Sequence, residues 1–420
     1  MGQLDLQELL ASTAAEVRPA GPDVIERAVA DARRRRGRRL VIVPSLLTVI
    51  AAAGLLLVPV VRPAPLVPGG GREPGFPAVT EDFSYLTANA RTAPAGRALA
   101  VVQYYWWDSV RTVVLGADRD TYRDLDPGLG SASFYGQAVL SPDGTLAAIA
   151  RGAGQVELVT LRTGKVRTLR LADPSFEAVV YAFTPDGRTL AAGLRTHLSD
   201  ASQPVLVDVA RGTIVPLPLR AVSEFAFSPD GQRIATQSGG LVSISDRSGV
   251  VRRSFPALRS EARLGGPNAW SPDGRYLVTV HESGGGSGPA EFAFLPVDPA
   301  DKGAPAPRSY PAASLLGWRS GSELVLGEST GPGQRVSVVD LVSGREQVVS
   351  SITGGAVTAV AAGLLTEAGT RPPGDPDFGP WPSWLWWLLG GGVLVLALVS
   401  VALVWVARWA IRVSRRPLSG

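Results

Sequence analysis

A four-residue motif recurs along the middle of this 420-residue chain at nearly constant spacing. Its four copies read Ser/Thr-Pro-Asp-Gly and begin at Ser141, Thr184, Ser228 and Ser271, so that successive prolines lie 43, 44 and 43 residues apart. A period in this range is typical of folds in which one small β-sheet is repeated around an axis. The spacing therefore predicts a repeated all-β domain.

Each copy has the residue types of a tight turn between antiparallel strands. Proline fixes φ at the second position, aspartate bonds to the local backbone, and glycine adopts the positive φ that follows. Aliphatic stretches flank the turns, as at Ala178–Phe183 and Arg188–Leu194, and a second hairpin follows each of them. Four strands per period form one blade of a β-propeller.

Degenerate copies extend the array at both ends, which gives six blades. The stretch Ala356–Thr366 has the pattern of one more hairpin. If it closes the ring together with strand residues near Phe83–Leu86 as a complete blade, the propeller has seven.

The Ser-Pro-Asp-Gly turn, preceded by Phe or Trp and followed by an aliphatic strand, resembles the turns of TolB-type and WD-repeat-like β-propellers. The resemblance covers roughly residues 78 to 368, and the absence of the Trp-Asp dipeptide from the blade ends makes the TolB-like pattern the closer one. The resemblance implies a fold. It does not imply a function, because propellers include enzymes, receptors and scaffolds.

Two hydrophobic segments without a charged residue bracket the repeats, 40–61 and 384–407. Each is long enough to cross a hydrocarbon core about 30 Å thick as a helix. A cleaved signal peptide is the alternative for the first segment, but its apolar run exceeds the usual ~7–15 residues and a long leader precedes it. We predict two transmembrane helices.

Arginines next to these segments indicate the orientation of the chain. They are Arg33, Arg34, Arg35, Arg36, Arg38 and Arg39 before the first segment, and Arg408 and Arg412 after the second. Because positive residues stay on the cytoplasmic side, both termini are expected in the cytoplasm and the propeller outside it. The expected protein is a two-span cell-membrane protein. Its few lysines beside abundant Arg, Ala and Gly are typical of GC-rich bacterial genomes, such as those of actinobacteria.

These features divide the chain into seven parts. We expect a cytoplasmic helical tail at 1–39, a first span at 40–61, a Pro/Gly linker at 62–77, the propeller at 78–368, a second Pro/Gly linker at 369–383, a second span at 384–407 and a basic cytoplasmic tail at 408–420. Linkers of this composition are extended or flexible.

The N-terminal tail carries two short amphipathic patterns, each opened by a capping box. Their apolar faces include Leu6, Leu9, Leu10, Val24, Ile25 and Val29. One hypothesis is docking to a cytoplasmic regulator. The layout resembles the tails of actinobacterial membrane proteins that partner sigma factors, although a zinc-binding His/Cys motif is absent. The alternative is a poorly ordered tail whose arginines only set topology and contact anionic lipid.

Six residues are candidates for a ligand or partner face: Trp106, Trp107, His197, Asp200, His281 and Glu282. Both histidines are expected in loops after the second strand of a blade, which line one face of a propeller, and the tryptophans offer a stacking surface. A metal site is one reading, but no short ligand pair is present. We therefore expect solvated loop histidines, no metal and no cofactor.

Gly327-Glu-Ser-Thr-Gly331 matches the G-x-S-x-G pattern of serine hydrolases. A nucleophile elbow requires a strand, a turn and a helix, whereas this segment lies between two expected strands. We expect an inter-strand loop and no enzyme. Nucleic acid is not an expected partner, because the positive charge is concentrated beside the spans.

The sequence favours a membrane-anchored, extracytoplasmic propeller that binds or senses something and relays it to a cytoplasmic partner such as a transcription regulator. An envelope scaffold or protein-interaction platform without signalling is the alternative. A hydrolase is a minor one. The expected partners are the lipid bilayer, a protein outside and a regulator at the tail.

Overall fold

In the computed structural model, the described residues are 73–80, 87–106, 109–125, 138–196, 201–256, 261–282, 288–331, 333–372, 374–380, 395 and 398–409. The chain divides into two compact units, Leu66–Pro382 and a second one formed by Met1–Pro65 with Ser383–Gly420. Every strand named below belongs to the first unit.

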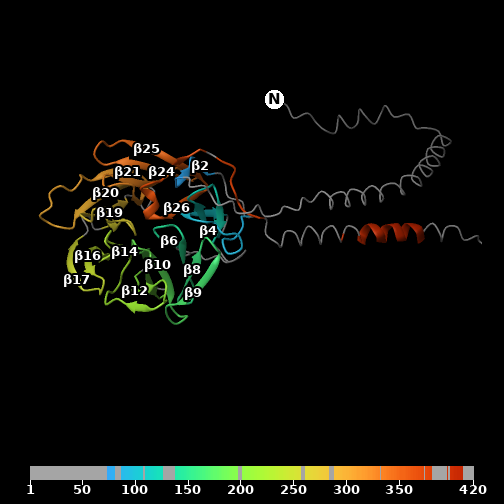
Figure 1. Ribbon diagram of the computed structural model, residues 1–420, viewed down its shortest axis with the longest axis horizontal. Helices are drawn as coiled ribbons and strands as arrows, with labels where there is room; N and C mark the ends of the chain where they lie inside the picture. Colours follow the sequence, from blue (N-terminus) through green and yellow to red (C-terminus); the bar gives the residue numbers. More distant parts are fainter. Residues whose placement is uncertain are drawn as a thin grey trace, which may run out of the picture. The chain divides into compact units, whose positions relative to one another are not determined.

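Six sheets of four or more strands make up the first unit (Figure 1). In sheet order, blade 1 is β26 (Gly355–Val360), β3 (Ala98–Trp106), β4 (Ser109–Gly116) and β5 (Tyr122–Asp124); blade 2 is β6 (Ala138–Leu140), β7 (Leu146–Arg151), β8 (Gln155–Thr160) and β9 (Lys165–Arg170); blade 3 is β10 (Glu177–Phe183), β11 (Thr189–Arg195), β12 (Gln203–Asp208) and β13 (Ile214–Pro216).

Blade 4 is β14 (Glu224–Phe227), β15 (Arg233–Ser238), β16 (Leu241–Asp246) and β17 (Val251–Pro256); blade 5 is β18 (Arg263–Leu264), β19 (Tyr276–Glu282), β20 (Pro289–Pro296) and β21 (Arg308–Pro311); blade 6 is β22 (Ala313–Trp318), β23 (Glu323–Ser329), β24 (Gly333–Asp340) and β25 (Glu346–Thr353), extended by β2 (Val79–Thr80). The predicted all-β, six-bladed propeller is confirmed.

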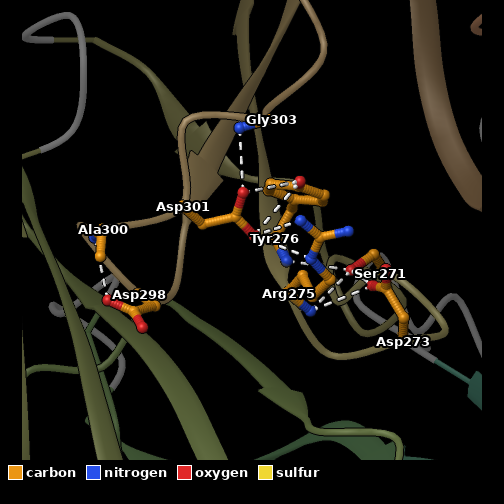
Figure 2. Close-up of polar contacts among 8 residues, drawn as sticks. All are labelled: Ser271, Asp273, Arg275, Tyr276, Asp298, Ala300, Asp301 and Gly303. Carbon is orange, nitrogen blue, oxygen red and sulfur yellow. Dashed lines mark hydrogen bonds and ion pairs between the residues drawn. The ribbon is translucent and has the colours of Figure 1, made fainter.

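The recurring motif forms the turn between the first two strands of blades 2 to 5. In blade 5, the Ser271 hydroxyl donates a hydrogen bond to the Asp273 carboxylate at 2.5 Å and accepts one from the Tyr276 amide at 3.0 Å. Arg275 then joins this turn to the connection between β20 and β21 through Asp301, at 2.7 Å (Figure 2). The Asp273 and Ser271 side chains thus replace backbone partners inside the turn, as the motif predicts.

The ring closes through strands from both ends of the domain. Strand β26 pairs antiparallel with β3, with Val357 opposite Val102, and supplies the first strand of blade 1. The expectation that Ala356–Thr366 forms a hairpin of a seventh blade is wrong, because the chain after β26 turns into the short helix α4 (Ala362–Leu365) instead of a returning strand. The segment Phe83–Leu86 lies outside the described residues.

Two short strands lie within the expected linkers. Strand β1 (Gly75–Pro77) runs parallel to β27 (Gly369–Arg371), and Phe76 of β1 is only 2% exposed. The folded unit is therefore wider than 78–368. Pro/Gly-rich composition allows an extended backbone, and here that backbone is hydrogen-bonded and anchored by one buried aromatic side chain.

Hydrophobic side chains fill the space between neighbouring blades. One cluster joins Ala148 and Val156 of blade 2 to Val180, Leu190 and Val205 of blade 3, all of which are buried. Apolar side chains alternate along each strand toward the two neighbouring sheets. Because the chain contains no cysteine, this repeated core stabilises the domain without disulfides.

The second unit is described only at residue 395 and over 398–409, where the chain is helical. Among the described residues, no helix is both long enough and apolar enough to cross a membrane. The segment 40–61 and most of 384–407 lie outside the described residues, so the two spans stay a prediction.

Candidate functional site

A cavity of about 350 Å³ lies between the first strands of blades 1 to 4. Those strands, β26, β6, β10 and β14, lie near the centre of the ring in Figure 1. The apolar part of the lining is Ala138, Val139, Val179, Val180, Phe225 and Pro267; the polar part is Gln103, Tyr181, Arg195, Ser223, Glu224 and Thr358. We call the polar part the cavity mouth.

The space narrows beyond Val139 and Pro267, which also line a second space of about 40 Å³. The other walls of this small space are apolar, except for Asn268. Ala362 of α4 contributes to it, and the same helix buries Leu364 and Leu365. Polar side chains are thus concentrated in the wider space.

Two irregularities in strand pairing bring polar side chains to the cavity. The register of β10 shifts between Val180 and Ala182, and that of β26 shifts between Val357 and Ala359. The residues at these bulges, Tyr181 and Thr358, both line the cavity. A β-bulge changes the direction of a side chain locally and recurs next to functional sites.

Tyr181 is held firmly in place. Its hydroxyl lies 2.5 Å from the Ser202 hydroxyl and donates to the Val222 carbonyl at 3.1 Å, and its ring stacks on Phe225. Burial raises the pKa of Tyr181, opposed by the hydrogen bond with Ser202. The side chain therefore remains a neutral phenol around pH 7.

Arg195 lies opposite Glu177 in the β10–β11 pair, and their side chains form an ion pair at 3.1 Å. Both side chains are about one fifth exposed. This arginine of the cavity mouth consequently has a carboxylate partner.

Glu224 differs from Glu177, because no hydrogen bond or ion pair of its carboxylate is found among the described residues. Burial raises its pKa to about 7, against the opposing charge of Arg263. Arg263 itself donates to Glu282. The cavity mouth therefore contains one carboxylate that changes charge near neutral pH and lacks a direct partner.

Among the proposed residues whose side chains the structure describes, neither His281 nor Glu282 lines this cavity. Trp106 ends β3 opposite Ser109, and Glu282 ends β19. His281 lies inside β19 opposite Glu291, so its placement in a loop is wrong: the strand continues past the expected end. Within the described ranges, no group of three or more His, Cys, Asp or Glu residues is placed to hold a metal.

Other proposed residues lie outside the described part of the chain: Trp107, His197, Asp200, Leu6, Leu9, Leu10, Val24, Ile25, Val29, Arg33, Arg34, Arg35, Arg36, Arg38, Arg39 and Arg412. Arg408 is an exposed helical residue of the second unit. These proposals stay predictions.

The G-x-S-x-G segment forms a connection between antiparallel strands. Ser329 is the last residue of β23 and pairs with Gln334 of β24. The strand-turn-helix geometry of a nucleophile elbow is therefore not formed at this serine.

Among the comparisons with known proteins, only the one with solved structures found similar proteins. No family model matches the chain, and no curated protein matches it. TolB from Acinetobacter baumannii is 15% identical with a TM-score of 0.44, over 64% of this chain and 67% of that one. A putative TolB from Agrobacterium tumefaciens is 16% identical with a TM-score of 0.42, over 64% and 94%.

Hydrazine synthase from Kuenenia stuttgartiensis is 19% identical with a TM-score of 0.39, over 51% of this chain and 65% of that chain. At these scores, the matches say nothing about ligands or activity. The assignment of the six-bladed propeller depends on the strand order and pairing described above.

Proposed function

We propose that this protein is a membrane-anchored binding module without catalytic activity. In this proposal, the propeller lies outside the cytoplasm, binds a partner or ligand at the cavity mouth, and relays the event to a cytoplasmic regulator through the N-terminal tail. The observation that carries the binding site is the Glu224 carboxylate, unpaired among the described residues, in a partly polar cavity of about 350 Å³.

Partial burial of a carboxylate without a partner costs stability, since burial disfavours its charged form. Two polar groups of the cavity mouth are already paired, Arg195 with Glu177 and Tyr181 with Ser202. Perturbed ionisable groups of this kind in a cavity are typical of functional sites. Binding requires no more than this rigid, partly polar surface.

Support for anchoring comes from the sequence. The uncharged segments 40–61 and 384–407 and the arginines beside them fit two spans with both termini in the cytoplasm. The apolar faces of the tail at 1–39 fit a docking site for a regulator.

The binding site is tested by filling the cavity mouth. Thr358 is exposed into the cavity from the bulge of β26, so Thr358→Trp occupies that space. Thr168→Trp on the exposed face of β9 is the matched control. In-cell crosslinking of the full-length chain, read by mass spectrometry, is expected to lose a specific partner with Thr358→Trp only. Equal partner lists for both variants would refute the site.

Relay to a regulator is tested by deleting residues 2–32, which leaves the topogenic arginines in place. The full-length chain is expected to capture a cytoplasmic partner that the shortened chain does not. If both chains capture the same envelope proteins and nothing cytoplasmic, the protein is a scaffold without signalling.

A further inference from the structure

The repeated turns allow equivalent positions to be compared between blades. In blade 4, Glu224 lies opposite Gln237; in blade 5, Arg263 lies opposite Val280. Gln237 and Val280 each follow the first residue of their turn motif, Ser228 and Ser271, by nine positions. Glu224 and Arg263 therefore occupy the same register position on neighbouring first strands.

Arg263 has a charge partner two residues further along the second strand. This partner is Glu282, which accepts a hydrogen bond from the guanidinium. The equivalent residue of blade 4, two positions after Gln237, is Gly239. The position that neutralises the charge in blade 5 thus has no side chain in blade 4.

The space beside Gly239 is open. A Cβ atom added there would meet no heavy atom within 4 Å. Gln237 does not substitute for the missing partner, because its amide donates to the carbonyls of Gly239 and Ala262 at 2.9 and 2.8 Å and accepts from the Leu264 amide. All of its bonds are directed to backbone groups.

In blade 3, a valine occupies the position equivalent to Glu224. Val179 lies opposite Gly193, nine positions after Thr184, and lines the same cavity. An uncharged side chain is therefore compatible with the fold at this position. Fold stability alone gives no reason for a carboxylate at Glu224.

We propose that Glu224 binds a positively charged nitrogen group, a guanidinium or an alkylammonium, of the ligand that enters the cavity mouth. The incoming cation takes the place of the charge partner that blade 4 lacks beside Gly239. This inference builds on the proposed function and specifies the chemistry of the ligand. Carboxylates prefer guanidinium groups because two parallel N–H donors match the two oxygens.

The test compares two probes that differ only in charge. N-acetyl-argininamide carries a guanidinium, and N-acetyl-citrullinamide replaces it with a neutral urea of the same shape. Titration calorimetry at pH 8 with the full-length protein is expected to show binding of the arginine probe at least tenfold tighter than that of the citrulline probe. Equal affinity of the two probes, or no binding of either, would overturn the inference.

Two further variants locate the interaction. Glu224→Gln is expected to weaken binding of the arginine probe at least tenfold. Gly239→Arg supplies the missing cation within the chain and is expected to compete with the probe, whereas Gly239→Gln imposes the same backbone strain at φ +57° without the charge and is expected to retain binding. Unaltered affinity in Glu224→Gln would place the cation elsewhere.

A third probe separates the two sources of such a group. Acetyl-Gly-Arg-Gly-amide presents the side chain within a peptide, so tighter binding than that of the single residue indicates a protein partner, and weaker binding indicates a small molecule. Failure of the charge preference is distinguishable from failure of the proposed function: if Thr358→Trp still abolishes partner capture, the cavity mouth binds a partner by other chemistry.

Discussion

Arg123 and Asp377 join two segments that are 254 residues apart in the chain. The guanidinium donates to the Asp377 carboxylate at 2.9 Å and to its backbone carbonyl at 2.7 Å, and also to the carbonyls of Ala93 and Tyr122. Arg123 is only 5% exposed. The segment 374–380 is thereby attached to the outer strand β5 of blade 1, where Asp377 also accepts a hydrogen bond from the Tyr122 amide.

Replacing this arginine is expected to destabilise the propeller. Arg123→Met removes four hydrogen bonds and leaves buried carbonyl groups without a donor, which costs about 2–4 kcal/mol. Arg162→Met on the exposed turn between β8 and β9 is the control and is expected to change stability by less than about 0.5 kcal/mol. Urea unfolding followed by tryptophan fluorescence measures both, and similar effects of the two substitutions would contradict the role of Arg123.

Glu224 makes the stability of the propeller depend on pH. Its pKa is about 7 in the folded chain, above the ordinary value of 4.5 that applies when unfolded. Between these values the folded state binds more protons, so the free energy of unfolding decreases as pH rises from about 4.5 to 7 and stays lowered above 7.

Glu224→Gln removes this titration. The variant and the wild type are expected to be similarly stable near pH 4, and the variant is expected to be more stable at pH 8 by up to about 3 kcal/mol. Thermal unfolding at a series of pH values tests this. A variant less stable than the wild type at pH 8 would show that the carboxylate has a stabilising partner.

Substitutions at two glycines of the repeated turn distinguish the cost of backbone strain from the cost of disturbing the contact between blades 1 and 2. Both have positive φ, +70° at Gly144 and +68° at Gly187. A Cβ on Gly144 would lie 2.1 Å from the Ala98 carbonyl oxygen, whereas a Cβ on Gly187 has no neighbour closer than 3.9 Å. Ala98 begins β3, the strand to which β26 adds, and its amide donates to the Gly144 carbonyl.

Gly187→Ala is expected to cost about 1–2 kcal/mol, the strain of a left-handed residue. Gly144→Ala is expected to cost at least about 2 kcal/mol more, because blade 1 and the turn of blade 2 must separate to admit the methyl group. Urea unfolding of the two full-length variants measures the difference. Equal costs would mean that the contact between Gly144 and Ala98 yields easily.

The repeated turns could be predicted because their chemistry is local. Each serine, aspartate and glycine of the motif acts within about five residues, and the motif spacing then gives the blades. Ring closure is different. The pairing of β26 with β3 consists of backbone hydrogen bonds between residues about 250 positions apart, and no residue type identifies such a partner.

The candidate site was missed for a related reason. The residues predicted from the sequence are mainly histidines and tryptophans near expected loops, whereas the unpaired group among the described residues is Glu224 at the start of β14. The register of Glu224 with Val179 and Arg263 comes from the strand pairing. Aligning the repeats through their turns sets Glu224, four residues before Ser228, against Val180 and Pro267, and a carboxylate where two other repeats have an uncharged residue is a usable signal. The bulge that brings Tyr181 to the cavity leaves no such trace in the sequence.

The N-terminal boundary of the folded unit gives a last prediction. Phe76 precedes the predicted start of the propeller at residue 78, yet it is 2% exposed and belongs to the core cluster of blade 1. Phe76→Ala is expected to destabilise the domain by about 3–5 kcal/mol, as for other large-to-small substitutions in a core. Val79→Ala, at a side chain that is 51% exposed, is expected to change stability by less than about 0.5 kcal/mol. Thermal unfolding of both full-length variants decides the matter: if Phe76→Ala is also nearly neutral, β1 is a dispensable extension and the propeller begins at residue 78.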